Sequence, residues 1–392
     1  MATDQFQSPD YLLVDELLTD EHKLIREIVR KYVKKEISPI IEDYAQRAEF
    51  PEQIIKQLGD LGCFGPTIPL EYGGGGLDYI SYGLMMQELE RGDSGVRSTA
   101  SVQGSLVMFP IHAYGSEAQK RKFLPKLASG EWLGCFGLTE PDHGSNPAGM
   151  LTNYKDAGDH VILNGSKMWI SNAPFAQVAV VWAKDENGDI RGLIVERGME
   201  GFSTPTTHGK WSLRASATGE LVFDNVKVPK ENIFPEIKGL KGPLGCLTKA
   251  RYGISWGALG AAMDCYDTAL RYSKERIQFD RPIGGFQLQQ KKLAEMITEI
   301  TKAQLLVWRV GSLMNEGRAT PQQVSMAKRN SCEIAANIAR DARQMLGGMG
   351  ITGEYSIMRH MMNLESVITY EGTHDVHLLI TGMDVTGLNA FK

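Results

Sequence analysis

Hydrophobic positions follow a helical period near the start of the chain. After Thr19, a good helix N-cap, apolar residues recur every three or four positions as far as residue 33. These residues are Leu24, Ile25, Ile28, Val29, Tyr32 and Val33. Their spacing places them on one face of an amphipathic helix. Further helices are predicted from Pro51 and over Tyr79–Arg91, with a turn at Gly73–Gly76 between them.

The pattern changes near Leu133, where short runs of β-forming residues begin to alternate with turn residues, as far as about Phe234. Asn164-Gly165 and Asn187-Gly188 are dipeptides typical of type I′ hairpin turns, which need positive φ at both central positions. We therefore expect an antiparallel β domain in the middle of the chain.

Helical periodicity returns after Gly242 and persists to the end of the sequence. Helices are predicted over Arg251–Gln278, Phe286–Glu316, Pro321–Gly347 and Thr373–Thr381. Helices, then strands, then helices indicate an α+β fold that is mostly α. We expect an N-terminal α-helical domain (1–133), a middle β domain (134–237) and a C-terminal helical bundle (238–392). Alternating βαβ units are absent, which argues against a doubly wound nucleotide-binding fold.

Composition narrows the class of protein. The chain has 392 residues, 42% of them hydrophobic and 23% charged, which is typical of a folded globular protein. Its net charge is −5, and no basic stripe suggests a nucleic-acid partner. No window reaches the ~18 apolar residues of a membrane span, so stable membrane insertion is not expected.

The cysteines and the first residues indicate the cellular compartment of the protein. The five cysteines form no CxxC pair and are interpreted as buried free thiols of a reducing compartment. The first twenty residues lack the basic and apolar regions of a secretory signal and are too acidic for a mitochondrial transit peptide. We expect a cytoplasmic bacterial protein, or a mitochondrial matrix protein if the chain is a processed eukaryotic form.

Two short motifs suggest other chemistry but lack its context. Gly348–Gly353 matches GxGxxG, yet it follows a predicted helix rather than a strand, which favours a helix C-cap and turn over a dinucleotide site. This interpretation of Gly348–Gly353 still permits a phosphate-binding loop of another kind. Glu371–His374 matches the Glu-x-x-His of di-iron bundles, which need a second copy that this sequence lacks. His374 and His377 are interpreted as polar helix positions, and no metal site is expected.

Four stretches carry a more specific signal: CFGLTEPDHGSN (135–146), WISN (169–172), RIQFDRPIGGFQ (276–287) and YEGTHD (370–375). In their order and spacing they resemble the acyl-CoA dehydrogenase family. The runs GDSGVRSTASVQGSLVM, LRASATGELV and NLESVITYEGTHDVHLLITG are similar to the branch of that family that acts on glutaryl-CoA. The resemblance implies an FAD-dependent oxidoreductase.

The resemblance implies that Glu371 is the catalytic base. Dehydrogenation of a thioester between Cα and Cβ needs a base for the α-proton and a hydride acceptor, which a flavin supplies. Burial would raise the pKa of a carboxylate towards the working range. The family stabilises the thioester oxyanion with the backbone N–H of this residue and a flavin hydroxyl, and Gly372 allows close approach of a ligand. The alternative is an exposed carboxylate at a helix start.

The resemblance also implies the FAD contacts. Thr139 would lie on the ring edge, Trp169 would cover the ring, and Ser171 would donate near N5. Arg276, Gln287 and Gln344–Gly348 would reach the FAD of an adjacent subunit, which implies a homotetramer. The implied cofactor-binding set is Phe136, Gly137, Leu138, Thr139, Gly144, Ser145, Trp169, Ile170, Ser171, Arg276, Phe279, Gln287, Gln344, Met345, Leu346, Gly347, Gly348 and Thr373. Alternatively, Trp169 fills a core and Arg276 forms a surface ion pair.

Substrate specificity would rest on Arg97 and Ser98. A dicarboxylic acyl chain ends in a charge whose burial is costly unless it is paired, and the Arg fork pairs with it bidentately. Glu90 lies about two helical turns away and would join this cluster. The implied substrate-binding set is Arg97, Ser98, Glu90, Ser145, Leu244, Gly245, Cys246, Leu247, Thr248, Lys249, Ala250, Arg251, Tyr370 and Gly372. Val96 departs from the branch, which often has Tyr there, and an isolated Arg at a helix end is more often a surface residue.

The reaction implied is oxidation of glutaryl-CoA to bound glutaconyl-CoA, followed by loss of CO2 to give crotonyl-CoA. Electrons would pass to an electron-transfer flavoprotein. Tyr370 and Glu90 fit the decarboxylating type. The alternatives are an enzyme that stops at glutaconyl-CoA, another short-chain acyl-CoA dehydrogenase, an acyl-CoA oxidase, and a non-catalytic assembly factor on the same fold.

Overall fold

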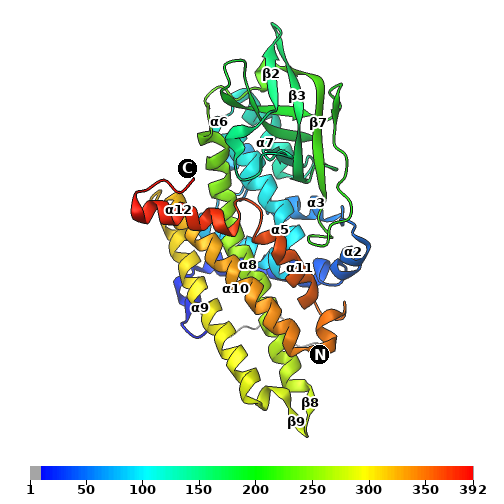
Figure 1. Cartoon of the computed structure of the whole chain (residues 1–392), viewed down its shortest axis with the longest axis vertical. Helices are drawn as coiled ribbons and strands as arrows, with labels where there is room; N and C mark the ends of the chain where they lie inside the picture. The colour runs from blue at the N-terminus through cyan, green and yellow to red at the C-terminus, as the bar shows by residue number, and fades with distance from the viewer. Residues whose placement is uncertain (1–9, 392) are drawn as a thin grey trace.

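The computed structural model describes residues 10–391. A β-sheet occupies one end of the molecule, and long helices run from it towards the other end (Figure 1). The first helices are α1 (Asp20–Tyr32), α2 (Ile41–Arg47), α3 (Ile54–Asp60), α4 (Tyr79–Gly92), α5 (Ser94–Ser101), α6 (Phe109–Tyr114) and α7 (Glu117–Ala128). The sheet contains β1 (Gly134–Gly137), β2 (Asn153–Asp156), β3 (His160–Ser171), β4 (Val178–Lys184), β5 (Ile190–Glu196), β6 (Phe202–Ser203) and β7 (Thr218–Pro229). After it come α8 (Lys241–Glu275), β8 (Ile277–Gln278), β9 (Arg281–Pro282), α9 (Gln287–Asn315), α10 (Pro321–Met345), α11 (Ile357–Val367) and α12 (His374–Thr386).

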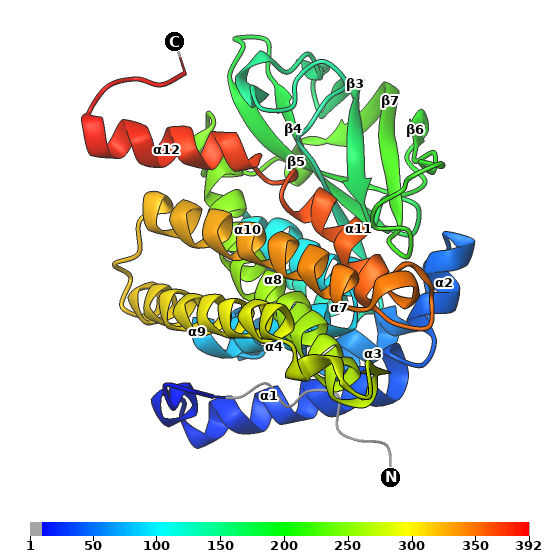
Figure 2. The same ribbon diagram turned by 60° about the horizontal axis from the view of Figure 1, so that its bottom comes forward.

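Helix α1 begins as the sequence predicts, but its apolar stripe is buried only in part. The Thr19 side chain accepts a hydrogen bond from the His22 N–H, which caps the helix. Val29 is buried, whereas Leu24 is 61% exposed and Ile28 is 44% exposed. The helix packs on α4 at the outside of the molecule (Figure 2). Helix α4 therefore covers only part of the apolar stripe of α1.

The sheet is mixed rather than wholly antiparallel. Its order is β1-β4-β2-β3-β7-β6, with β5 on β4, and β1 pairs with β4 in parallel. The prediction of an antiparallel domain is therefore wrong for this pair, and also for β2 and β4, which meet in parallel at Asn153 and Lys184. Alternate β4 residues join different cores: Val178 and Val180 pack on the helical side, and Ala179 and Val181 pack on the other. A strand buried on both faces is apolar throughout, which explains the run VAVVWA.

One of the two predicted hairpin turns is present. Asn187-Gly188 joins β4 to β5, although only Gly188 has positive φ (80°), so the turn is not type I′. Asn164-Gly165 instead lies inside β3 at an irregularity opposite β7, and that prediction is wrong. Gly165 has φ 136°, and a Cβ there would fall 2.5 Å from Thr152 Oγ1. Close strand packing, not a turn, requires this glycine.

The C-terminal bundle is built around α8, whose middle is buried almost continuously between α4 and α10. The helix ends at Glu275, and the segment predicted as its continuation forms the β8/β9 hairpin. Helix α11 was not predicted. Gly347–Ile351 forms a 3-10 turn after α10, as expected of a helix end. All five cysteines are buried and unpaired, as expected, and none of the helices in residues 10–391 is long and apolar enough to cross a membrane.

Candidate active site

A short loop between α11 and α12 carries Tyr370, Glu371 and Gly372. Glu371 has φ 53° and Gly372 has φ 95°, so two successive residues adopt left-handed conformations. For a residue with a side chain this costs about 1–3 kcal/mol and persists only where the surroundings impose it. Thr373 then caps α12 by accepting a hydrogen bond from the Val376 N–H. This loop, which we call the base loop, therefore has a strained backbone. The Thr373 cap fixes the end that leads into α12.

Glu371 is half-buried, and one of its two carboxylate oxygens is covered by the protein. Its Oε2 is shut off from solvent and has no hydrogen-bond partner among the described residues. Burial raises the pKa of Glu371, and the positive charges of Arg97, Lys328 and Arg251 oppose that rise. A desolvated carboxylate with a free lone pair suits a general base. The alternative of an exposed carboxylate at a helix start does not match this environment.

Arg97 lies against the base loop and is only 1% exposed, so it is not a surface residue. Its Nε donates to Glu90 Oε2 at 2.5 Å, and its Nη2 donates to the Tyr370 hydroxyl. Ser98 Oγ lies 3.4 Å from the same hydroxyl. Burial alone would lower the pKa of Arg97, but the charge of Glu90, its hydrogen bond and the nearby Tyr370 and Glu371 together raise it. The guanidinium stays charged, and its Nη1 makes no hydrogen bond with residues 10–391.

Room for this ion pair comes from a glycine in the middle of α8. A Cβ on Gly257 would fall 2.1 Å from Glu90 Oε2 and 3.0 Å from Arg97 Nε. A glycine inside a long helix is the sequence signal that could have revealed this close approach. Val96, the departure noted in the sequence, is fully buried in the helical core.

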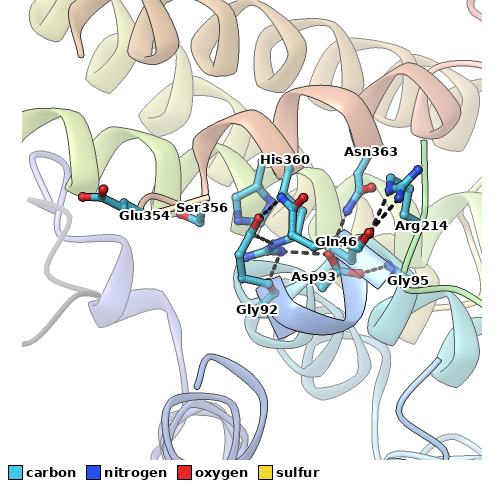
Figure 3. Close-up of polar contacts among 12 residues, drawn as sticks. Gln46, Gly92, Asp93, Gly95, Arg214, Glu354, Ser356, His360 and Asn363 are labelled. Atoms are coloured by element: carbon cyan, nitrogen blue, oxygen red, sulfur yellow. Dashed lines mark hydrogen bonds and ion pairs between the residues drawn. The ribbon is translucent and has the colours of Figure 1, made fainter. Parts of the chain in front are cut away.

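A second buried network fixes the helices that carry these residues (Figure 3). Asp93 is fully buried, and its Oδ1 caps α5 by accepting from the Gly95 N–H at 2.7 Å. Its Oδ2 accepts from Arg359 Nη1 and from Asn363 Nδ2, both at 2.8 Å. Arg359 and Asn363 belong to α11, which leads into the base loop. Asp93 thus ties the helix of Arg97 to the helix before Glu371, a connection that sequence reasoning missed.

Of the segment 244–251, Arg251 reaches the base loop, where its Nε donates to the Glu371 carbonyl at 2.6 Å. The rest forms the first turns of α8, with Leu244 exposed. Ser145 is exposed in the loop after β1. Neither Ser145 nor Leu244 forms a hydrogen bond with the Arg97 cluster.

The residues expected beneath a flavin line an accessible part of the sheet. Trp169 is 56% exposed with φ 61°, so it does not fill a core. Thr139 and Ser171 are half-buried, and the Thr139 carbonyl accepts from the Met168 N–H, which joins the two segments. Nothing lies within 4 Å of a Cβ built on Gly144. An exposed indole, two hydroxyls and an open glycine loop fit a flat, partly polar ring system with a phosphate tail.

The other expected flavin contacts lie elsewhere. Arg276 and Phe279, which is 88% exposed, belong to the β8/β9 hairpin at the end of the molecule away from the sheet (Figure 1). Gln344 is near the end of α10 and accepts a hydrogen bond from Lys292 of α9. Gln287, the first residue of α9, is exposed. Within one protomer the structure does not bring these residues to Trp169.

Comparison with known proteins places the whole chain. Models of the acyl-CoA dehydrogenase N-terminal, middle and C-terminal domains match residues 19–131, 135–226 and 238–386. Glutaryl-CoA dehydrogenase of Desulfococcus multivorans is 38% identical, over 95% of this chain and 98% of the relative. The mitochondrial short-chain specific acyl-CoA dehydrogenase of Homo sapiens is 34% identical, over 93% and 89%.

Solved structures agree. The crystal structure of glutaryl-CoA dehydrogenase from Mycobacterium smegmatis has a TM-score of 0.96 at 50% identity, covering 98% of this chain and all of that one. A structure of such an enzyme from the same organism in complex with FADH2 has a TM-score of 0.95 at 48% identity, covering 96% and 97%. By the matches to all three domains and by its fold, the chain belongs to the acyl-CoA dehydrogenase family.

Proposed function

We propose that this enzyme is a decarboxylating glutaryl-CoA dehydrogenase. The observation that carries the proposal is the buried Arg97, held by Glu90 and Tyr370 beside the Glu371 carboxylate, with Nη1 left for a ligand. Around Glu371 three cations (Arg97, Arg251, Lys328) face two carboxylates (Glu90, Glu371), which leaves one net positive charge. An acyl chain that ends in a carboxylate would neutralise it. An unsubstituted acyl chain would not.

The proposed chemistry divides among the residues already described. Glu371 removes the proton from Cα, with its carboxylate kept reactive by burial. Arg97 holds the terminal carboxylate of the substrate in place while Cβ loses hydride. The bond from the γ-carbon to that carboxylate then breaks, CO2 leaves, and the electron pair enters a dienolate. Protonation of the dienolate gives crotonyl-CoA.

The cofactor is FAD, which when bound accepts the hydride from Cβ. The exposed Trp169 and the hydroxyls of Thr139 and Ser171 would hold its ring system, and the open loop at Gly144 would admit its phosphates. An electron-transfer flavoprotein is the proposed electron acceptor. The relative solved with FADH2 supports the choice of cofactor.

The nearest alternative is an enzyme that stops at glutaconyl-CoA. The decarboxylating choice rests on the resemblance of Tyr370 and Glu90, which contact Arg97 Nη2 and Nε, to the decarboxylating type. A second alternative is a short-chain acyl-CoA dehydrogenase for unsubstituted chains, since the human short-chain enzyme is also a relative. The buried Arg97–Glu90 pair disfavours it, because a simple alkyl chain gives such a charged pair nothing to bind.

The test is product analysis. Purified enzyme is mixed with glutaryl-CoA labelled at the distal carboxyl carbon and an artificial electron acceptor. The proposal expects labelled CO2 and crotonyl-CoA in equal amounts, without accumulation of glutaconyl-CoA. Glutaconyl-CoA alone would identify the non-decarboxylating enzyme. Turnover of butyryl-CoA but not of glutaryl-CoA would remove the assignment of substrate.

A further inference from the structure

The base loop rests on a lysine that the chemistry above does not use. Lys328 lies on α10, which packs beside α8, α11 and α12 (Figure 2). It is 1% exposed and is among the largest fully buried side chains. Its Nζ donates to the Tyr370 carbonyl at 2.9 Å and to the Gly372 carbonyl at 2.8 Å. One ammonium group therefore bridges the carbonyls on either side of Glu371.

This arrangement is unusual for a buried charge. A buried ammonium is normally paired with a carboxylate, because its desolvation is costly. Among residues 10–391 no carboxylate lies within salt-bridge distance of Lys328, and the base loop carbonyls are its hydrogen-bond acceptors. Burial lowers the pKa of Lys328, whereas Glu371 acts to raise it. The lysine and the base are thus electrostatically linked as well as joined through the backbone.

The neighbouring groups complete the support of the loop. Arg251 of α8 binds the middle carbonyl, that of Glu371. His377 of α12 is fully buried, so it is not a solvated helix position, and neither ring nitrogen has a partner among the described residues. Burial and the charges of Lys328 and Arg251 lower its pKa to about 3, so it stays neutral. A Cβ on Gly372 would fall 2.9 Å from His377 Nε2, so the loop is packed tightly against this ring.

Other titratable groups face the same place from every packed element. Arg97 of α5, paired with Glu90 of α4, contributes charge near Lys328, and Cys332 lies one turn further along α10. Burial raises the pKa of the Cys332 thiol to about 11, so it is neutral. Lys328 thus contacts the loop backbone through two hydrogen bonds and has no pairing carboxylate among residues 10–391.

We propose that Lys328 is a positioning residue that holds the base loop in its left-handed conformation and places a positive charge behind the Glu371 carboxylate. The inference rests on the proposed role of Glu371 as base, but not on the identity of the acyl chain. It assigns two separable effects to one side chain: a backbone clamp through two hydrogen bonds, and a charge that favours the ionised base.

The experiment separates the two effects with Lys328→Met, Lys328→Gln and Lys328→Arg in the FAD-loaded enzyme. Met removes donor and charge, Gln keeps a donor, and Arg keeps the charge. Because a nearby cation favours an ionised carboxylate, its loss should move the acid limb of the kcat/KM profile up by about one pH unit in Met and Gln. At pH values below the wild-type midpoint, kcat/KM of these two variants should be ~10-fold lower than that of the wild type. Arg should keep the wild-type midpoint even if its maximal rate is lower.

The clamp has a readout that needs no turnover. Hydrogen exchange of peptides covering residues 366–376 should speed up in Lys328→Met and less in Lys328→Gln. Arg329→Gln is the matched control, because it removes one positive charge from the same helix at a position paired with Glu333 on the surface. It should change neither the midpoint nor the exchange.

The substrate for these profiles is whichever acyl-CoA the wild-type enzyme oxidises, so a wrong acyl chain does not affect the outcome. If Lys328→Met and Lys328→Gln keep the wild-type acid midpoint and exchange rates, the proposal is overturned. A loss of thermal stability alone, with an unshifted profile, would make Lys328 a purely structural residue and would also overturn it. If Glu371→Gln keeps full activity, the proposed base itself fails, which is a different result.

Discussion

Three features of the Glu371 environment together suit it to act as a base. It has positive φ, a carboxylate oxygen without a partner in the described chain, and three cations nearby. Burial raises its pKa, while Arg97, Lys328 and Arg251 limit the rise. Burial therefore makes the carboxylate a stronger base, while the three cations favour its ionised form.

We expect Glu371→Gln to bind FAD and acyl-CoA but to lose dehydrogenation by at least ~100-fold, because the base is removed while the shape is kept. Bleaching of the flavin by substrate under anaerobic conditions is the measurement. Retention of the flavin spectrum in the purified variant is the control for folding. A smaller loss would mean that another group removes the proton.

The same variant has a predicted effect on stability. A carboxyl group whose pKa is raised by folding contributes stability that is fully present at pH values below its pKa in the unfolded chain. That contribution is lost as pH rises through its pKa in the folded protein. At pH 7 the variant should therefore be at least as thermally stable as the wild type. The difference should shrink as pH falls towards the ordinary Glu value. A variant that is less stable at high pH than at low pH, relative to wild type, would contradict the direction of the shift.

Arg97 should set the choice between glutaryl-CoA and pentanoyl-CoA, which differ in the charged end. Arg97→Met should lower kcat/KM for glutaryl-CoA by orders of magnitude, because the buried carboxylate loses its partner, a cost of several kcal/mol. Pentanoyl-CoA should change little or improve. The ratio of the two values is the measurement, since a folding defect lowers both together. An unchanged ratio would remove Arg97 from the acyl pocket.

At the scale of elements, the site depends on how three helices are held. Helix α5 carries Arg97, and α11 leads into the base loop. Helix α10 supports that loop through the hydrogen bonds of Lys328. Asp93 joins the first two through its contacts with Arg359 and Asn363 (Figure 3). Because these contacts are buried, they position the two ends of the acyl site more firmly than surface pairs do.

Asp93→Ala should destabilise the enzyme by about 3–5 kcal/mol, because it takes one of two carboxylates, Asp93 and Glu42, from the buried Arg359 guanidinium and also removes the cap of α5. Glu365→Gln is the control: its pair with Arg340 also involves α11 but is exposed, and it should cost ~1 kcal/mol or less. Denaturant unfolding of both variants gives the comparison. Equal small effects would show that the Asp93 network does not hold the helices together.

At the scale of the whole molecule, the two sets of expected FAD contacts lie far apart. Trp169 is on the sheet, whereas Arg276 and Gln344 lie towards the opposite end (Figure 1). The arrangement supports the proposal that subunits share each FAD and that the enzyme is a homotetramer.

We expect sedimentation to give a tetramer that carries FAD, and Arg276→Ala to release FAD more readily at equal protein concentration. The reason is loss of a charged contact at the edge of the neighbour's cofactor. Flavin content after gel filtration is the measurement. A monomer with full flavin content would contradict shared binding.

The sequence by itself determined the succession of helices, sheet and helices, because apolar period and turn residues are local properties of the chain. Through the resemblance of its motifs to a known family it also pointed to Glu371, Arg97 and Glu90, and the structure brings these three residues together. Tertiary structure decided what local pattern does not encode. The parallel pairing of β1 with β4, the glycine bulge at Gly165 and the hairpin after α8 depend on contacts between distant segments. So does the role of Lys328, which in sequence is one basic residue among many on a helix. Only packing removes it from water and leaves it the carbonyls of the base loop as partners.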